Sequence, residues 1–150
     1  MVSLVNRRAP VRPADSFQKL DRPQFVSGAC GSGRTNLYEN LVIADIVKNA
    51  LNRGIRPEIY FFRDSHGNEI DLLIREKGLL TPVEIKSAAT FSTGFVKHLE
   101  WFQTLGVRRV QPGAVLYNGE QTFNVRGVGV LNPLHVEDIW QTLTVPSTGS

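Results

Sequence analysis

Two carboxylates and a lysine on consecutive predicted strands are the side chains in this sequence most suited to catalysis. Alternating apolar residues predict the two strands, over residues 69–75 and 79–86. Lys77-Gly78 forms a tight turn between them, and the three features together predict a hairpin. Counting outward from this turn pairs Asp71 with Glu84, and Lys86 follows on the same face as Glu84.

Two directly opposed carboxylates destabilise a sheet unless a positive charge lies between them. A divalent cation supplies that charge, because magnesium takes one or two carboxylates and completes its shell with water and phosphate oxygens. The alternative is an exposed hairpin in which Lys86 pairs with Glu84 or Asp71, worth well under about 1 kcal/mol. Leu73 and Leu80 share the acidic face, which favours a sheet covered on both sides and carboxylates that need a partner.

A further carboxylate belongs to a helix predicted over residues 36–51. Glu39 stands three residues after Asn36, the spacing of a capping box, in which its carboxylate would serve the helix end. Glu39 also shares a helical face with Ile46 and Ala50, which would direct the carboxylate toward the core. The sequence leaves both interpretations open.

Other polar and aromatic residues give weaker signals. The histidines, His66, His98 and His135, fall in a turn, a helix and a loop without the spacing of metal ligands. Trp101 and Phe102 stand at helical spacing and are predicted to be core residues, the alternative being exposed rings that stack on bases. We assign no catalytic role to the neighbouring glutamine, Gln103.

The composition is that of one ordinary domain with a core. The chain has 150 residues, of which 41% are hydrophobic and 21% charged. Its one cysteine, Cys30, cannot form an intramolecular disulfide, which favours a reducing, cytoplasmic setting. No apolar run approaches the roughly 20 residues that a bilayer requires, so we expect no membrane association.

Positive charge is concentrated at the N-terminus. Residues 1–34 carry a net charge of +4 and leave −1 for the remainder. A basic arm attracts a polyanion such as nucleic acid, although a solvated tail has the same composition. The glycine- and serine-rich stretch near its end is typical of a linker. The chain is therefore predicted to comprise a basic, flexible arm, a folded domain and a tail, over residues 1–34, 35–143 and 144–150.

The polar residues together resemble the motif of the PD-(D/E)XK nuclease superfamily. Asp71 matches its aspartate, Glu84-Ile85-Lys86 its (D/E)-x-K element, and Glu39 the glutamate of its preceding helix. More specifically, the chain resembles an uncharacterised domain found C-terminal to AAA-type ATPases in bacteria and archaea, on residues 37–40, 62–74 and 82–87. The ATPase part of that arrangement is absent from this sequence, which would make the chain a detached copy.

This resemblance implies an α/β sandwich of the restriction-endonuclease type, with a mixed central sheet flanked by helices at 36–51 and 93–105. It also implies that Asp71, Glu84 and the Ile85 carbonyl bind Mg²⁺ or Mn²⁺, and that Glu39 assists through water. Lys86 would orient the attacking water and help to deprotonate it. Later strands are expected over residues 113–117 and 127–131.

Two functions from different classes remain open. The first is a metal-dependent nuclease that hydrolyses phosphodiester bonds of nucleic acid, with DNA as the expected substrate. The second is a non-catalytic module that binds nucleic acid or a protein through the same fold. The resemblance further implies an AAA-type ATPase domain or a second copy of the chain as a partner. The acidic pair and lysine on one face favour the enzyme.

Overall fold

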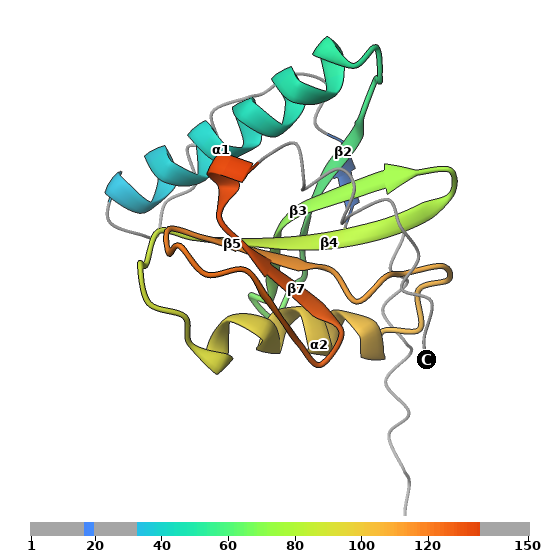
Figure 1. Ribbon diagram of the computed structural model, residues 1–150. Coiled ribbons are helices and arrows are strands. Elements are labelled where there is room, and N and C mark those ends of the chain that lie inside the picture. Colours follow the sequence, from blue (N-terminus) through green and yellow to red (C-terminus); the bar gives the residue numbers. More distant parts are fainter. Residues whose placement is uncertain (1–16, 20–32, 136–150) are drawn as a thin grey trace, which may run out of the picture.

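The computed structural model describes residues 17–19 and 33–135 (Figure 1). Most of the predicted basic arm and the whole predicted tail lie outside these residues. The described elements are, in chain order, β1 (Phe17–Lys19), α1 (Gly33–Asn52), β2 (Glu58–Arg63), β3 (Glu69–Glu76), β4 (Leu79–Lys86), the 3-10 helix η2 (Thr93–Val96), α2 (Lys97–Thr104), β5 (Ala114–Tyr117), β6 (Phe123–Val125), β7 (Val128–Leu131) and the 3-10 helix η3 (Pro133–His135).

The described strands form one mixed sheet in the order β1-β2-β3-β4-β5-β7-β6. The half from β1 to β4 is antiparallel throughout. β5 pairs in parallel with both β4 and β7, and β6 returns antiparallel along the outer edge of β7. The predicted mixed sheet is therefore confirmed.

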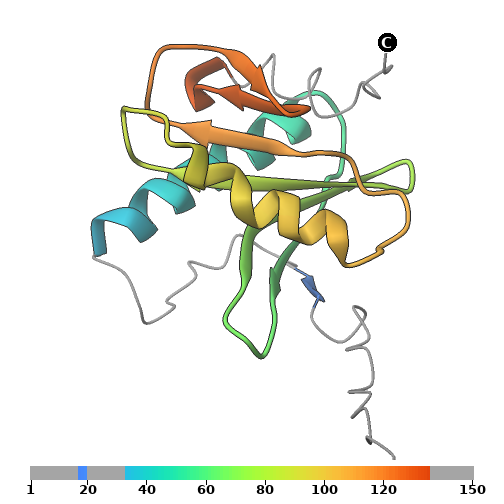
Figure 2. The ribbon, with the colours of Figure 1, turned by 90° about the horizontal axis from the view of Figure 1, so that it is seen from below.

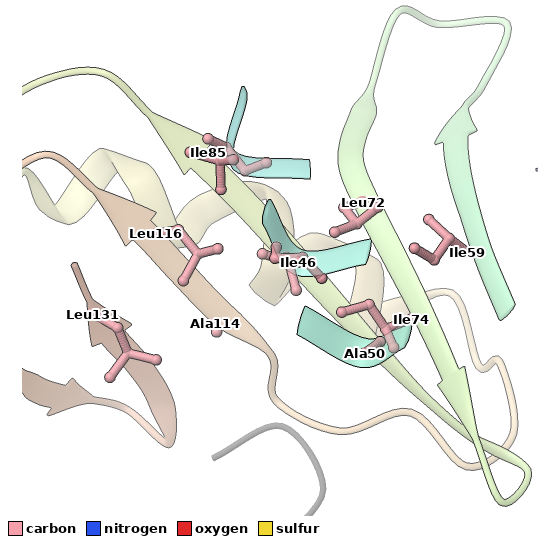
Figure 3. Packing of buried hydrophobic residues seen from close by; sticks show 11 residues of the cluster. Ile46, Ala50, Ile59, Leu72, Ile74, Ile85, Ala114, Leu116 and Leu131 are labelled. Carbon is pink, nitrogen blue, oxygen red and sulfur yellow. The ribbon is translucent and has the colours of Figure 1, made fainter. Parts of the chain in front are cut away.

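One helix covers each face of the sheet, as Figures 1 and 2 show from two directions. On the first face, α1 packs Val42, Ile46 and Ala50 against sheet residues that include Leu72 and Ile85 (Figure 3). On the second face, α2 packs Leu99 and Phe102 against a separate cluster, which includes Phe62, Ile70, Leu73, Val115 and Val130. The predicted sandwich of helices around a mixed sheet is thus present.

Phe102 is fully buried and lies edge-on to Phe62 at 5.2 Å between ring centroids. Trp101 is half-buried and packs against the same ring at 6.0 Å. Their prediction as core residues is therefore confirmed. Such aromatic pairs stabilise a core beyond the area they bury.

The hairpin between β3 and β4 has the predicted turn and follows the predicted register as far as Leu72 and Val83, but the predicted pair of Asp71 with Glu84 is not part of the ladder. Lys77 and Gly78 both adopt positive φ, at 49° and 77°, as a two-residue turn of the primed type requires. Pairing then runs outward from Glu76 and Leu79 to Leu72 and Val83. This register brings the last residues of β4 beside the first residues of β3.

Two predicted helix boundaries are wrong. α1 begins at Gly33, so Asn36 does not start the helix and Glu39 lies in its second turn, which rules out the capping box. The helix predicted over 93–105 is divided into η2 and α2. Ser92 caps η2 by accepting a hydrogen bond from the Gly94 amide, and the tighter turn precedes the α-helix.

Candidate functional site

The site is built where β3 leaves the regular ladder. β2 pairs Tyr60 with Leu73 and Phe62 with Ile70, so two steps along β2 correspond to three along β3. β3 therefore carries one extra residue, a β-bulge. The packing identifies it, because Ile70 and Leu73 contact the α2-side core whereas Leu72 contacts the α1-side core. Without Asp71 these three side chains would alternate regularly, so Asp71 is the inserted residue.

The bulge turns the Asp71 carboxylate into the gap between β3 and β4. Its Oδ2 accepts a hydrogen bond of 2.8 Å from the main-chain amide of Ile85. The carboxylate oxygen of Asp71 therefore takes the place of the main-chain carbonyl that would accept this hydrogen bond in a regular antiparallel ladder. The Ile85 side chain points the other way, into the core below α1 (Figure 3).

Lys86 lies between the two carboxylates that the hairpin brings together. Its Nζ is 2.5 Å from Glu84 Oε2 and 3.5 Å from Asp71 Oδ2. The lysine side chain is 30% exposed and the Glu84 side chain 1% exposed, so the pair opens to solvent through the lysine. Burial alone would lower the pKa of Lys86, but the negative charges of Asp71 and Glu84 outweigh it and raise that pKa.

Glu84 is the most buried charged group of the cluster. The pKa of Glu84 is raised to about 8, chiefly by burial and next by the charge of Asp71, with Lys86 acting in the opposite direction. Its Oε1 is enclosed and has no hydrogen-bond partner. A buried carboxylate oxygen without a donor is costly, so this atom is a candidate for binding a ligand.

Glu39 approaches the same cluster from the half-buried side of α1. The pKa of Glu39 is raised to about 7, chiefly by burial and next by the charge of Asp71, with Lys86 acting in the opposite direction. The charge of Glu39 also raises the pKa of Glu84 across the cluster. The interpretation in which Glu39 faces the core therefore holds, and all four predicted polar residues share one electrostatic environment.

The charge balance of this cluster is unfavourable without another cation. Glu39, Asp71 and Glu84 against Lys86 give a formal charge of −2 when all four are ionised. Such a charge in a largely buried place is relieved either by protons on the carboxylates or by a divalent cation. The raised pKa values of both glutamates are the first of these two solutions.

The donor set suits a hard divalent cation. Carboxylate oxygens and a main-chain carbonyl are the ligands that Mg²⁺ and Mn²⁺ take, with water at the remaining positions. Within residues 17–19 and 33–135, no three His, Cys, Asp or Glu side chains gather closely enough to form a metal cage. A cation here would therefore depend on one or two carboxylates and on water.

One residue near the site was missed by the sequence analysis. His98, in the first turn of α2, places its Nδ1 at 3.7 Å from Glu84 Oε1. Figure 1 shows why they meet: β4 ends on the side of the molecule where α1 and α2 both begin. No motif spacing relates a histidine to a glutamate fourteen residues earlier, so only the packing of α2 on the sheet reveals the contact.

A comparison with protein-family models gives one match, which covers residues 34–136 and is described as a domain of unknown function, DUF4143. The chain belongs to the DUF4143 family. This domain is typically found with AAA ATPases. No curated protein matches the chain. In the described part of this DUF4143 domain, no helix has both the length and the apolar character needed to cross a membrane.

The raised pKa values give the DUF4143 domain a pH-dependent stability. A carboxyl group with a pKa of 4.5 when unfolded and about 8 when folded holds its proton more tightly in the native state. Its contribution is complete below pH 4.5 and is lost as the pH rises through 8. We expect the metal-free domain to lose on the order of 2 kcal/mol of stability between pH 5.5 and pH 8.5.

Urea unfolding at a series of pH values measures this loss. Glu84→Gln keeps the size of the side chain without its charge, so it should flatten the profile, whereas Glu58→Gln changes an exposed glutamate on β2 and should leave it unchanged. An equal slope in wild type and Glu84→Gln would contradict the assignment.

Proposed function

We propose that this domain binds one Mg²⁺ or Mn²⁺ and hydrolyses phosphodiester bonds of nucleic acid. The observation that carries the proposal is the largely buried cluster of three carboxylates and one lysine, formally −2 when all four are ionised, in which Glu84 Oε1 has no hydrogen-bond donor. A structural ion pair would need one carboxylate for one lysine. Three carboxylates around one lysine match the charge of a divalent cation instead.

Asp71, Glu84 and the Ile85 carbonyl would hold the cation, and Glu39 would act through water. When bound, a divalent cation lowers the pKa of bound water and neutralises negative charge on a phosphoryl group. Asp71 is held in place by the Ile85 amide, so its carboxylate is preorganised. This rigidity favours catalysis because no reorganisation is needed as charge develops.

Lys86 supplies the positive charge of the site. Its side chain is the more exposed partner of the lysine–Glu84 pair, and it carries three N–H donors. With a cation held by the carboxylates, the Lys86 ammonium would be free to donate hydrogen bonds to an attacking water or to a phosphoryl oxygen. In the hydrolysis, the water oxygen forms a bond to phosphorus while the bond from phosphorus to the leaving oxygen breaks.

Nucleic acid is the proposed substrate because a cation site open to solvent suits a chain of phosphodiesters. The basic residues 1–34 would add an electrostatic attraction that weakens with salt. An AAA-type ATPase domain is the proposed protein partner, in keeping with the family. Binding of nucleic acid without cleavage would support the non-catalytic module instead.

Calorimetric titration with Mn²⁺ tests the cation site. Wild type should bind one equivalent, and an Asp71→Ala/Glu84→Ala double variant should bind at least about tenfold more weakly, because two charged ligands are lost. Asp45 is an exposed acidic residue on α1, and Asp45→Ala should bind as wild type does. Equal Mn²⁺ affinity in wild type and the double variant would mean that this site does not exist.

A further inference from the structure

Two histidines of this domain stand beside carboxylates at the same distance but in different surroundings. His66 Nδ1 is 3.7 Å from Asp64 Oδ2, in the turn between β2 and β3. His98 Nδ1 is 3.7 Å from Glu84 Oε1. In both pairs the distance is too long for a hydrogen bond, so neither histidine satisfies its carboxylate directly.

The Asp64 carboxylate needs nothing from its histidine. Its Oδ1 accepts hydrogen bonds from the main-chain amides of His66 and Asn68, and its Oδ2 accepts one from the Asn68 side chain, each at 2.8 Å. These bonds are those of a turn held by an aspartate. The first pair is therefore a structural feature of the loop.

The Glu84 carboxylate differs, because its two oxygens have different surroundings. Oε2 is paired with Lys86, whereas Oε1 is enclosed without a hydrogen-bond donor and is nearest to the imidazole. The Glu84 side chain is 1% exposed and that of His98 53% exposed. An unpartnered buried oxygen thus faces a ring that reaches from a helix and remains accessible to solvent.

The gap of 3.7 Å between these two atoms is somewhat wider than the separation of two ligands on one metal ion. Two ligands of one first-row divalent cation, each at about 2.1 Å, are separated by roughly 3 Å. A small rotation of the exposed His98 ring would close the difference from 3.7 Å. Within the described part of the chain, the His98 ring makes no hydrogen bond that would hold it back from this movement.

We infer that His98 is a further ligand of the proposed cation, completing with Glu84 Oε1 a site that prefers Mn²⁺ and later first-row cations to Mg²⁺. The inference rests on the proposed function and deepens it, since it names the class of cation. Imidazole nitrogen binds first-row transition ions well, whereas Mg²⁺ favours oxygen ligands and its own water. A site of carboxylates alone would lack this discrimination.

The test uses the full chain without any histidine tag and Mn²⁺ or Mg²⁺ alone as the probe. We expect His98→Ala to weaken Mn²⁺ binding about tenfold and Mg²⁺ binding less than about threefold, because only the first loses a preferred ligand. His66→Ala is the matched control, and it should change neither affinity. Since His98 is half-exposed, its replacement should leave the melting temperature nearly unchanged.

Electron spin-echo spectroscopy of the Mn²⁺ complex reads out the ligand directly. Wild type and His66→Ala should show coupling to a directly bound imidazole nitrogen, and His98→Ala should lack it. Mn²⁺ bound with wild-type affinity but without nitrogen coupling would overturn the inference and leave the carboxylate site intact. No Mn²⁺ binding by wild type would overturn both the inference and the proposed function.

Discussion

Lys86→Ala should reduce phosphodiester cleavage by at least about a hundredfold, because the variant loses the charge that stabilises the transition state. The fold should persist, since Lys86 is partly exposed and contributes no apolar core contact. Cation binding should persist or tighten, because the lysine competes for Glu84 Oε2 and Asp71 Oδ2. Activity and Mn²⁺ affinity should therefore separate in this one variant.

The measurement is hydrolysis of labelled single- and double-stranded DNA and RNA with Mg²⁺ or Mn²⁺. Lys97→Ala is the matched control, because it removes an exposed lysine at the start of α2 without touching the cluster. Cleavage by Lys86→Ala at the wild-type rate would assign the activity to another site or to a contaminant. If wild type cleaves none of these substrates, the domain is a binding module.

Gly113→Ala should cost about 3 kcal/mol of stability, the largest effect that we expect from a single added methyl group. Gly113 precedes β5 with φ at +95°, and a Cβ there would lie 2.3 Å from the main-chain oxygen of Pro82. Main-chain atoms cannot move away as the end of a long side chain can. The added atom would push apart β4 and β5 at the centre of the sheet.

Urea unfolding of Gly113→Ala and Gly106→Ala separates this clash from backbone strain. Gly106 has a similar positive φ, +69°, but open space around it, so Gly106→Ala should cost about 1 kcal/mol. Equal losses in the two variants would show that strain alone acts and that β4 and β5 do not approach as closely as described.

Local sequence patterns were sufficient to predict the hairpin that carries the motif. β4 has the predicted bounds, and β3 extends one residue beyond its predicted end. Apolar and polar residues alternate clearly along these strands. The turn at Lys77-Gly78 requires positive φ, and its glycine is visible in the sequence. For the same reason Asp71 and Glu84 were correctly expected to be close, since a short turn determines the register of a hairpin, but they meet through Lys86 and not as a direct cross-strand pair.

Features that depend on contacts between distant segments could not be predicted. β1 and β6, each three residues long, are too short for a periodic pattern, and they are strands because β2 and β7 offer free edges. The approach of His98 to Glu84 depends on how α2 packs. The bulge at Asp71 was also missed, because a run of apolar residues with one aspartate reads equally well as a regular strand.

Loss or gain of Asp71, the inserted residue of β3, is a simple way for this fold to lose or gain its chemistry. Removing Asp71 would leave Ile70, Leu72 and Leu73 in ordinary alternation and would restore a continuous ladder beside β2. The Ile85 amide would lose the Asp71 carboxylate as its acceptor, but Glu84 would lose a neighbouring negative charge, and a sheet with regular pairing and one fewer buried charge should be more stable. Selection for thermal robustness alone would therefore favour deletion of this residue, and a one-codon insertion into a plain strand is enough to create the position.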